Sequence, residues 1–147
     1  MIIIHGMETH LPRFAARALA ARLRVMPAVV VTGARQTGKS TLSIEFTPGR
    51  RRYHSLDDID VQDLARRDPG ALLEGEQPVT LDEIQREPSL LNAVKRAIDR
   101  KRTPGRFLLT GSANLAMVSG VSESLAGRAS YLTLWPMTRR EQFGLGR

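Results

Sequence analysis

One stretch of this chain matches the pattern G-x-x-x-x-G-K-[ST] without a mismatch: Gly33-Ala34-Arg35-Gln36-Thr37-Gly38-Lys39-Ser40. An apolar run, residues 28–31, precedes it, and residues 41–45, which can form a helix, follow it. A buried strand, a tight glycine turn and a helix N-terminus together form a loop that binds phosphate. The stretch therefore predicts that the chain binds a nucleoside triphosphate.

Each part of this loop has its own physical task. Gly33 and Gly38 allow backbone angles and close approaches that a Cβ atom would prevent. The backbone N–H groups of the loop and of the helical turn that includes Thr41 are expected to point at the β-phosphate, where the helix dipole adds a favourable potential. We expect Lys39 to place its charge on the β- and γ-phosphates and the Ser40 hydroxyl to ligate Mg²⁺.

The composition is typical of a globular domain. The chain has 147 residues, of which 41% are hydrophobic and 25% charged, which suits one domain with a sizeable core. No apolar run approaches the ~20 residues that span a bilayer, and the apolar start, residues 1–4, is too short for a signal peptide. The absence of cysteine excludes disulfides and thiolate metal sites. We therefore expect a cytoplasmic protein that is not bound to a membrane.

The net charge of +7 leaves nucleic acid open as a partner. The densest basic clusters, residues 50–52 and 100–102, each lie beside a Pro-Gly turn, so we expect solvated loops rather than a binding surface. No aromatic residues are interleaved with these clusters to stack on single-stranded bases. Charge alone thus supports a nucleic-acid partner only weakly.

The apolar periodicity predicts short strands that alternate with helices. Residues 1–10 show no periodicity, and we expect a disordered leader before a single domain over residues 11–147. Strands are expected at residues 28–32, 52–56, 78–81, 106–110 and 130–134. Helices are expected at residues 11–25, after the glycine loop, at residues 59–67 and 71–73, from residue 89, and within residues 114–126. This alternation favours an α/β fold of three layers around a mostly parallel sheet.

A second acidic stretch, residues 79–83, offers what ATP hydrolysis requires beyond a phosphate loop. Asp82 is expected at the carboxyl edge of the sheet near Ser40, where it would hold Mg²⁺ directly or through water. Glu83 would face the γ-phosphate and accept a proton from the attacking water. A surface acidic turn is the alternative.

Two later stretches add candidate polar groups. If the strand at residues 106–110 lies between the strands that carry Lys39 and Asp82, Thr110 or Ser112 can donate a hydrogen bond to the γ-phosphate or to the water. Arg128, after a glycine turn, could stabilise transition-state charge on the γ-phosphate in the same chain or across a subunit boundary. Ordinary loop polar residues and a solvated arginine remain alternatives.

Six segments occur in a characteristic order: GARQTGKST, YHSLDD, DP-x-x-LL, LDEIQREPSLL, FLLTGSAN and VSESLAGRA. Together they resemble prokaryotic AAA-type ATPases of the AAA+ superfamily, known mostly as ATP-binding proteins. In that family an N-terminal ATPase domain precedes a nuclease-like C-terminal domain of unknown function. The resemblance covers about residues 11–143.

The resemblance implies a Walker A motif at residues 33–41, a Walker B motif ending at residues 82–83, and a sensor at residues 110–112. It also implies the signature of residues 126–128 before the last strand, a five-stranded sheet of the additional-strand type, and ATP and Mg²⁺ as ligands. The chain ends where the family continues into its second domain. We therefore expect the ATPase core alone, as a fragment, a truncated product or a stand-alone unit.

The expected function is Mg²⁺-dependent ATP hydrolysis, with self-association if Arg128 acts across a subunit boundary. A nucleotide-binding switch with little hydrolysis is the alternative, and the presence of Glu83 favours hydrolysis over it. A small P-loop phosphotransferase is a weaker alternative, because the Asp82-Glu83 pair beside a sensor-like strand is not expected in a kinase. Arg13, in the first expected helix, is a weak candidate for contacts to the base.

Overall fold

The structure, a computed structural model, describes residues 13–117 and 121–144. The expected leader, residues 1–10, lies outside the described residues. Within them, five strands form one sheet in the order β2-β3-β4-β1-β5, and every pair of neighbours is parallel. The strands are β1 (Ala28–Gly33), β2 (Arg52–Ser55), β3 (Val79–Asp82), β4 (Phe107–Ser112) and β5 (Ala129–Thr133). The five-stranded sheet that the resemblance implies is confirmed, and β4 lies between β1 and β3, which meets the condition stated above for Thr110 and Ser112.

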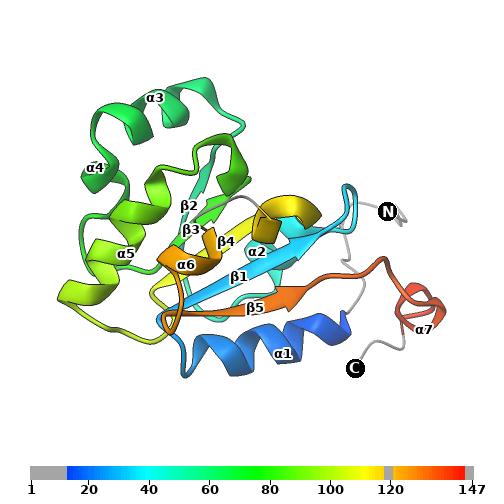
Figure 1. Cartoon of the computed structure of the whole chain (residues 1–147). Coiled ribbons are helices and arrows are strands. Elements are labelled where there is room, and N and C mark those ends of the chain that lie inside the picture. Colours follow the sequence, from blue (N-terminus) through cyan, green and yellow to red (C-terminus); the bar gives the residue numbers. More distant parts are fainter. Residues whose placement is uncertain (1–12, 118–120, 145–147) are drawn as a thin grey trace.

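Helices connect these strands and cover both faces of the sheet, as Figure 1 shows. The α-helices are α1 (Phe14–Leu23), α2 (Lys39–Glu45), α3 (Ile59–Arg67), α4 (Pro69–Leu73), α5 (Leu90–Arg100), α6 (Val121–Ser124) and α7 (Arg139–Gln142). Two short 3-10 helices, η1 (Ile84–Arg86) and η2 (Ala113–Met117), follow β3 and β4 directly. The predicted α/β fold of three layers is confirmed.

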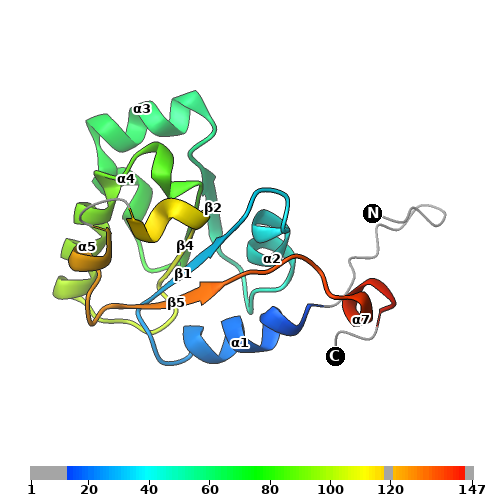
Figure 2. The same ribbon diagram turned by 45° about the vertical axis from the view of Figure 1, so that its right-hand side comes forward.

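The alternation of side chains along each strand separates two cores. On one face, Val29, Val31 and Leu108 pack with Leu19 of α1 and Leu42 of α2. On the other face, the larger core joins strand residues to α3, α4 and α5; it includes Ala28, Val30, Leu81, Phe107, Leu109, Leu72 and Val94. Figures 1 and 2 show α1 on one side of the sheet and α3, α4 and α5 on the other. Strands buried on both faces explain why the sequence shows apolar runs rather than alternation.

Local signals account for the starts of α3 and α4. Asp58 caps α3 by accepting a hydrogen bond from the Asp60 N–H, and Asp68 caps α4, whose first residue is Pro69. The first helix is shorter than expected, since α1 ends at Leu23 and a turn leads to Pro27. The 3-10 turn of η1 was not expected from the sequence. No helix among the described residues is long and apolar enough to cross a bilayer.

The expectation of a solvated loop is wrong for Arg51. Its guanidinium donates hydrogen bonds to the Thr80 hydroxyl (3.0 Å) and to the carbonyls of Gly105 (2.8 Å) and Val79 (2.9 Å). Burial, with the nearby charge of Arg106, lowers the pKa of Arg51 to about 10. Arg51 therefore fastens the start of β2 to the neighbouring strands, and it gives the buried Thr80 a partner.

Candidate functional site

A cleft of about 680 Å³ opens at the carboxyl edge of the sheet. This is the edge where open parallel α/β sheets bind ligands, and the volume is in the usual range of ligand pockets. The lining residues come from the glycine loop, α2, the turn after β2, the segment from the end of β3 through η1, and the end of β4; they are Arg35, Gln36, Gly38, Lys39, Ser40, Thr41, Asp57, Glu83, Gln85, Arg86 and Ser112. The fold thus brings residues of the glycine loop and residues that follow Asp82 in the sequence together around one cleft.

The glycine loop has the backbone geometry that its two glycines predict. Gly38, immediately before α2, has φ 86°, which a residue with a Cβ rarely adopts. A Cβ on Gly33 would lie 2.4 Å from the backbone oxygen of Leu134, so only glycine fits there. The Thr37 hydroxyl closes the loop by donating to the Ala34 carbonyl (2.9 Å). These contacts hold the loop at the start of α2, whose first N–H groups have no partner within the helix.

Lys39 is a buried cation without an anionic partner among the described residues. The residue is only 6% exposed, and its Nζ donates to the carbonyls of Gly33 (3.1 Å) and Ala34 (2.8 Å). Two neutral carbonyls compensate a buried ammonium incompletely. Because the Lys39 side chain lines the cleft, a phosphate there would supply the missing negative charge.

Asp82 presents the opposite case, a buried carboxylate without a cation among the described residues. It is 3% exposed at the end of β3. Its Oδ2 accepts hydrogen bonds from Ser40 Oγ (2.8 Å) and the Tyr53 hydroxyl (2.5 Å), and its Oδ1 accepts one from Thr110 Oγ1. Three neutral hydroxyls surround this charge, so the site is suited to a hard cation.

The same residues allow a test of whether Mg²⁺ fits. The described residues hold no group of three or more histidine, cysteine, aspartate or glutamate side chains that could bind a metal ion. Mg²⁺ is commonly held by one or two carboxylates, water and the phosphates of its ligand rather than by a cage of protein groups. A single carboxylate, Asp82, beside the Ser40 hydroxyl and a phosphate-binding loop therefore fits Mg²⁺ bound together with a phosphate.

Glu83 follows Asp82 and lines the cleft, as expected. Its backbone is left-handed at φ 58°, and its N–H donates to Thr110 Oγ1 (3.2 Å). A non-glycine residue in this conformation is uncommon and is found at functional sites more often than elsewhere. The Glu83 carboxylate accepts a hydrogen bond from the side-chain amide of Gln85.

The two candidates on β4 have different positions. Thr110 is fully buried, and its hydroxyl is used by Asp82 and the Glu83 N–H, so it braces the acidic pair rather than reaching into the cleft. Ser112 does line the cleft, and its backbone N–H donates to Gln85 Oε1 (3.3 Å). Of the two, only Ser112 lies where it could contact a ligand.

Comparison with known protein families decides the identity at this point. A family described as an AAA domain matches residues 26–143, which include the glycine loop, Asp82-Glu83 and the strands on which they lie. The chain belongs to this AAA-domain family.

Relatives with sequence similarity are considerably longer than this AAA domain. Uncharacterized proteins of Mycobacterium bovis (Mb2031c) and Mycobacterium tuberculosis (Rv2008c) are each 38% identical to it over 132 residues. These matches cover 88% of this chain and 30% of each relative. The chain thus spans less than a third of the curated relatives it matches.

Two solved structures share the fold at low sequence identity. Caenorhabditis elegans PCH-2 matches with a TM-score of 0.50 and 16% identity, over 94% of this chain and 45% of that protein. A DNA polymerase III gamma subunit-related protein of Thermotoga maritima matches with a TM-score of 0.53 and 12% identity, over 85% of this chain and 47% of that protein. Together with the parallel sheet, they establish a P-loop NTPase fold for this AAA domain.

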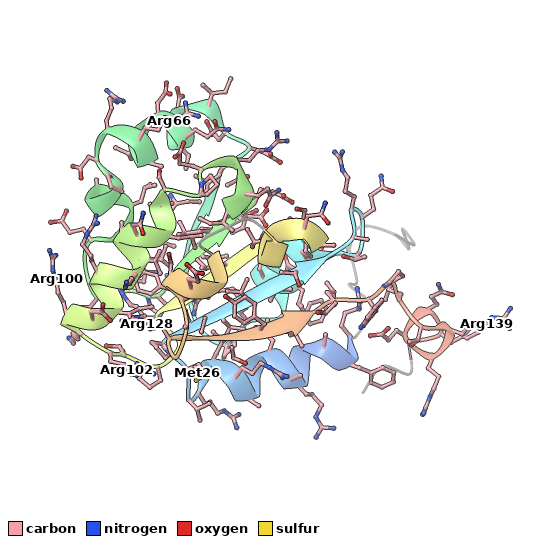
Figure 3. All side chains as sticks on the ribbon, viewed as in Figure 1. Met26, Arg66, Arg100, Arg102, Arg128 and Arg139 are labelled. Atoms are coloured by element: carbon pink, nitrogen blue, oxygen red, sulfur yellow. The ribbon has the colours of Figure 1, made fainter. Side chains whose placement is uncertain are left out.

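The structure does not bring Arg128 to the cleft. Arg128 immediately precedes β5, at the amino edge of the sheet, and forms an ion pair with Asp99 of α5 (2.6 Å). Figure 3 shows it near Met26 and Arg102, at the end of the sheet opposite to the glycine loop. The hydrogen bond to Asp99 raises the pKa of Arg128. Contact between Arg128 and a γ-phosphate of the same chain is not supported by this geometry.

This AAA domain has residues that contact the predicted site without having been predicted to do so, among them Gln85, Tyr53 and Arg13. Tyr53 on β2 reaches Asp82, and burial and that hydrogen bond raise the pKa of its hydroxyl, which therefore remains a donor. Arg13, considered above only for the base, contacts the glycine loop by donating to the Thr37 carbonyl (2.7 Å). The segment YHSLDD contains Tyr53, but no local pattern indicated that its hydroxyl would meet Asp82.

Proposed function

We propose that this AAA domain binds ATP with Mg²⁺ and hydrolyses it. The observation that carries the proposal is that two buried charges of opposite sign, Lys39 and Asp82, lie on either side of Ser40, and neither has a counter-ion among the described residues. Lys39 precedes Ser40 in the loop, and Asp82 accepts the hydrogen bond of Ser40. A Mg²⁺–nucleotide complex carries both complementary charges, phosphate for Lys39 and a cation for Asp82.

In this proposal each residue has a defined role. The loop amides from Gly33 to Thr41 and the Lys39 ammonium bind the phosphates, while Ser40 and Asp82 hold Mg²⁺. The metal ion, when bound, neutralises charge on the phosphates. Glu83 orients the attacking water and accepts its proton, and Ser112 donates a hydrogen bond at the γ-phosphate. Arg128 is retained only as a group that acts on a neighbouring subunit.

The contact between Gln85 and Glu83 favours a second candidate function. A general base must be free to approach water, and here the Glu83 carboxylate accepts the Gln85 amide. If that contact persists with nucleotide bound, the domain is a switch that binds ATP and turns it over very slowly.

The length of the relatives suggests which part of the whole protein ATP binding or turnover would act on. Since the chain spans 30% of each curated relative, we propose that ATP binding or turnover acts on a further domain of the whole protein. The nuclease-like C-terminal domain of the family resembled above is the candidate.

Nucleotide binding is tested by calorimetry with Mg²⁺-ATP on this chain and on Lys39→Ala. We expect the wild type to bind and Lys39→Ala to lose binding. Lys101→Ala is the matched control, because Lys101 forms an exposed ion pair with Glu76 and does not line the cleft. Equal affinities for wild type and Lys39→Ala would refute the assignment of the phosphate loop.

Hydrolysis is tested by phosphate release from Mg²⁺-ATP, with Glu83→Gln as the second protein. The substitution keeps the shape of the side chain but removes its basicity, so binding should be retained and turnover should stop. Binding without turnover in both proteins would support the switch instead. Equal turnover in both would eliminate Glu83 as the general base.

A further inference from the structure

Arg13, immediately before α1, connects three separate parts of the chain. It is 8% exposed, and each of its guanidinium nitrogens has a different partner. Nη1 donates to the Thr37 carbonyl in the glycine loop (2.7 Å), and Nη2 donates to the Trp135 carbonyl after β5 (2.8 Å). Nε donates to Glu141 of α7 (3.2 Å). A buried guanidinium with a hydrogen-bond partner at each of its three nitrogens is held in one position.

The hydrogen bond from Arg13 to the glycine loop fixes the orientation of the peptide group between Thr37 and Gly38. In a trans peptide the carbonyl and the following N–H point to opposite sides. The Thr37 carbonyl points at Arg13, so the Gly38 N–H points away from Arg13, and Gly38 is one of the residues that line the cleft. A Cβ on Gly38 would lie 3.2 Å from Arg13 Nη1, a crowded distance that the guanidinium could relieve only by shifting slightly.

The other end of the connection is the carboxylate of Glu141. Its Oε1 accepts the Phe14 N–H (2.8 Å) in addition to Arg13, and its Oε2 accepts the N–H (2.8 Å) and hydroxyl (3.1 Å) of Thr138. The contacts with Thr138 form the capping box that begins α7. Figures 1 and 2 place α7 beyond the first residues of α1. The same carboxylate therefore begins α7 and neutralises the arginine that holds the loop.

We infer that Arg13 is a positioning residue that aims the Gly38 amide at phosphate and, through Glu141, ties the shape of the phosphate loop to the placement of α7. Nucleotide in the loop and α7 on Glu141 then stabilise each other. The coupling is reciprocal, because it is a free energy shared by two equilibria. This inference rests on the proposed nucleotide binding and adds a route from the nucleotide to the segment after β5.

The first test needs only the wild-type chain. Hydrogen–deuterium exchange is measured at the amides of Gln142, in α7, and Phe143, directly after it, which donate to the carbonyls of Thr138 and Arg139, with and without saturating Mg²⁺-ADP. We expect nucleotide to slow their exchange. Amides of α3 serve as the control, because no hydrogen bond found among the described residues joins α3 to the glycine loop, so α3 reports overall stabilisation. Slowing in α7 no greater than in α3 would overturn the coupling.

The second test measures nucleotide affinity in variants. Arg13→Met should weaken Mg²⁺-ATP about tenfold, as expected for the loss of one hydrogen bond from a charged group. Glu141→Gln should weaken it about threefold, and the double variant should bind no more weakly than Arg13→Met. Arg66→Met is the control, since Arg66 of α3 is half-exposed and distant from α7 in Figure 3. If Arg13→Met does not fold, Arg13→Lys, which cannot reach all three partners, replaces it.

The outcomes separate this inference from the proposed function. A wild-type chain that binds no nucleotide would refute both. A wild type that binds, with Arg13 variants of equal affinity and lower thermal stability, would show that Arg13 is merely structural and would overturn the inference alone. Weaker binding in Arg13→Met together with protection of α7 supports it.

Discussion

Two carboxylates in this AAA domain, Asp82 and Glu141, are equally buried at 3% exposure but have opposite surroundings. Glu141 accepts hydrogen bonds from a guanidinium, two backbone N–H groups and a hydroxyl. Asp82 accepts only hydroxyl groups, and no cation pairs with it among the described residues. One buried charge is neutralised by the protein and the other is not.

The difference separates a structural site from a candidate functional one. Removing a charge from water is costly, and a cation repays the cost only where it is close and well oriented. Arg13 does so for Glu141, which needs nothing further. The hydroxyls around Asp82 do not neutralise its charge, and in the function proposed above Mg²⁺ would do so. Burial alone does not indicate function, whereas an unmatched buried charge in a cleft does.

The largest expected effect in this comparison is that of Glu141→Gln on stability. Removing the negative charge leaves Arg13 buried with carbonyl partners only, which should cost about 3 kcal/mol of unfolding free energy. Urea denaturation measures it. Glu76→Gln is the control, because Glu76 pairs with Lys101 on the surface and its loss should not change the midpoint measurably. A cost for Glu141→Gln as small as for the control would mean that Glu141 is not the neutralised charge described here.

The pH dependence of the unfolding free energy gives a second test of whether the protein neutralises the charge of Glu141. Burial alone would raise the pKa of Glu141, but hydrogen bonds from the Thr138 and Phe14 N–H groups and the charge of Arg13 lower it below its ordinary value of 4.5. The folded state therefore releases this proton more readily than the unfolded state, and the contribution is complete above about pH 4.5. It is lost as the pH falls through the lowered pKa. The stability difference between wild type and Glu141→Gln should be constant near neutral pH and shrink in acid; a constant difference would contradict this assignment.

Asp82→Asn should act in the opposite direction on stability. The neighbouring hydroxyls of Ser40 and Tyr53 can rotate to accept from the new amide, and the unmatched charge disappears. We expect unfolding free energy to rise by about 1 kcal/mol in the absence of ligand. Calorimetry should also show that Mg²⁺ no longer strengthens ATP binding. A variant that unfolds more easily, with an unchanged Mg²⁺ effect, would place Asp82 with Glu141 as a structural residue.

The sequence predicts best those parts that depend on neighbours along the chain. The strands and the glycine loop followed by Lys39 and Ser40 are encoded by local patterns, whereas the sheet of the additional-strand type was expected only from the family resemblance. Asp82 belongs to this group, because an acidic pair at the end of a buried strand is itself a pattern. The fold places these residues together at one edge, since all the strands are parallel.

The parts that could not be predicted depend on contacts between distant segments. Arg13 and Glu141 are 128 residues apart, and nothing in either neighbourhood indicates the other. Tyr53 meets Asp82 only because β2 pairs with β3 in a register that opposes Ser55 to Asp82. Arg51 lies near a Pro-Gly turn and looked solvated, but the adjacent strand ends bury it. Side-chain destinations of this kind follow from tertiary packing rather than from local pattern.

The smallest expected effect concerns Tyr53, and it tests whether hydroxyls tune the unmatched charge. Tyr53→Phe removes one of the hydrogen bonds to Asp82 while keeping the ring, so folding should be unaffected. The Asp82 carboxylate would be less well oriented, and Mg²⁺ affinity in the presence of ADP should fall about threefold.

Tyr131→Phe is a matched control: Tyr131 lies on the opposite edge strand, β5, with the same 38% exposure as Tyr53. Mn²⁺ titration followed by electron paramagnetic resonance measures the affinity without relying on turnover. A threefold loss for Tyr53→Phe alone would show that the protein orients this carboxylate for a cation, as Arg13 and the backbone orient Glu141. Equal affinities in both variants would mean that Ser40 and Thr110 suffice to orient it.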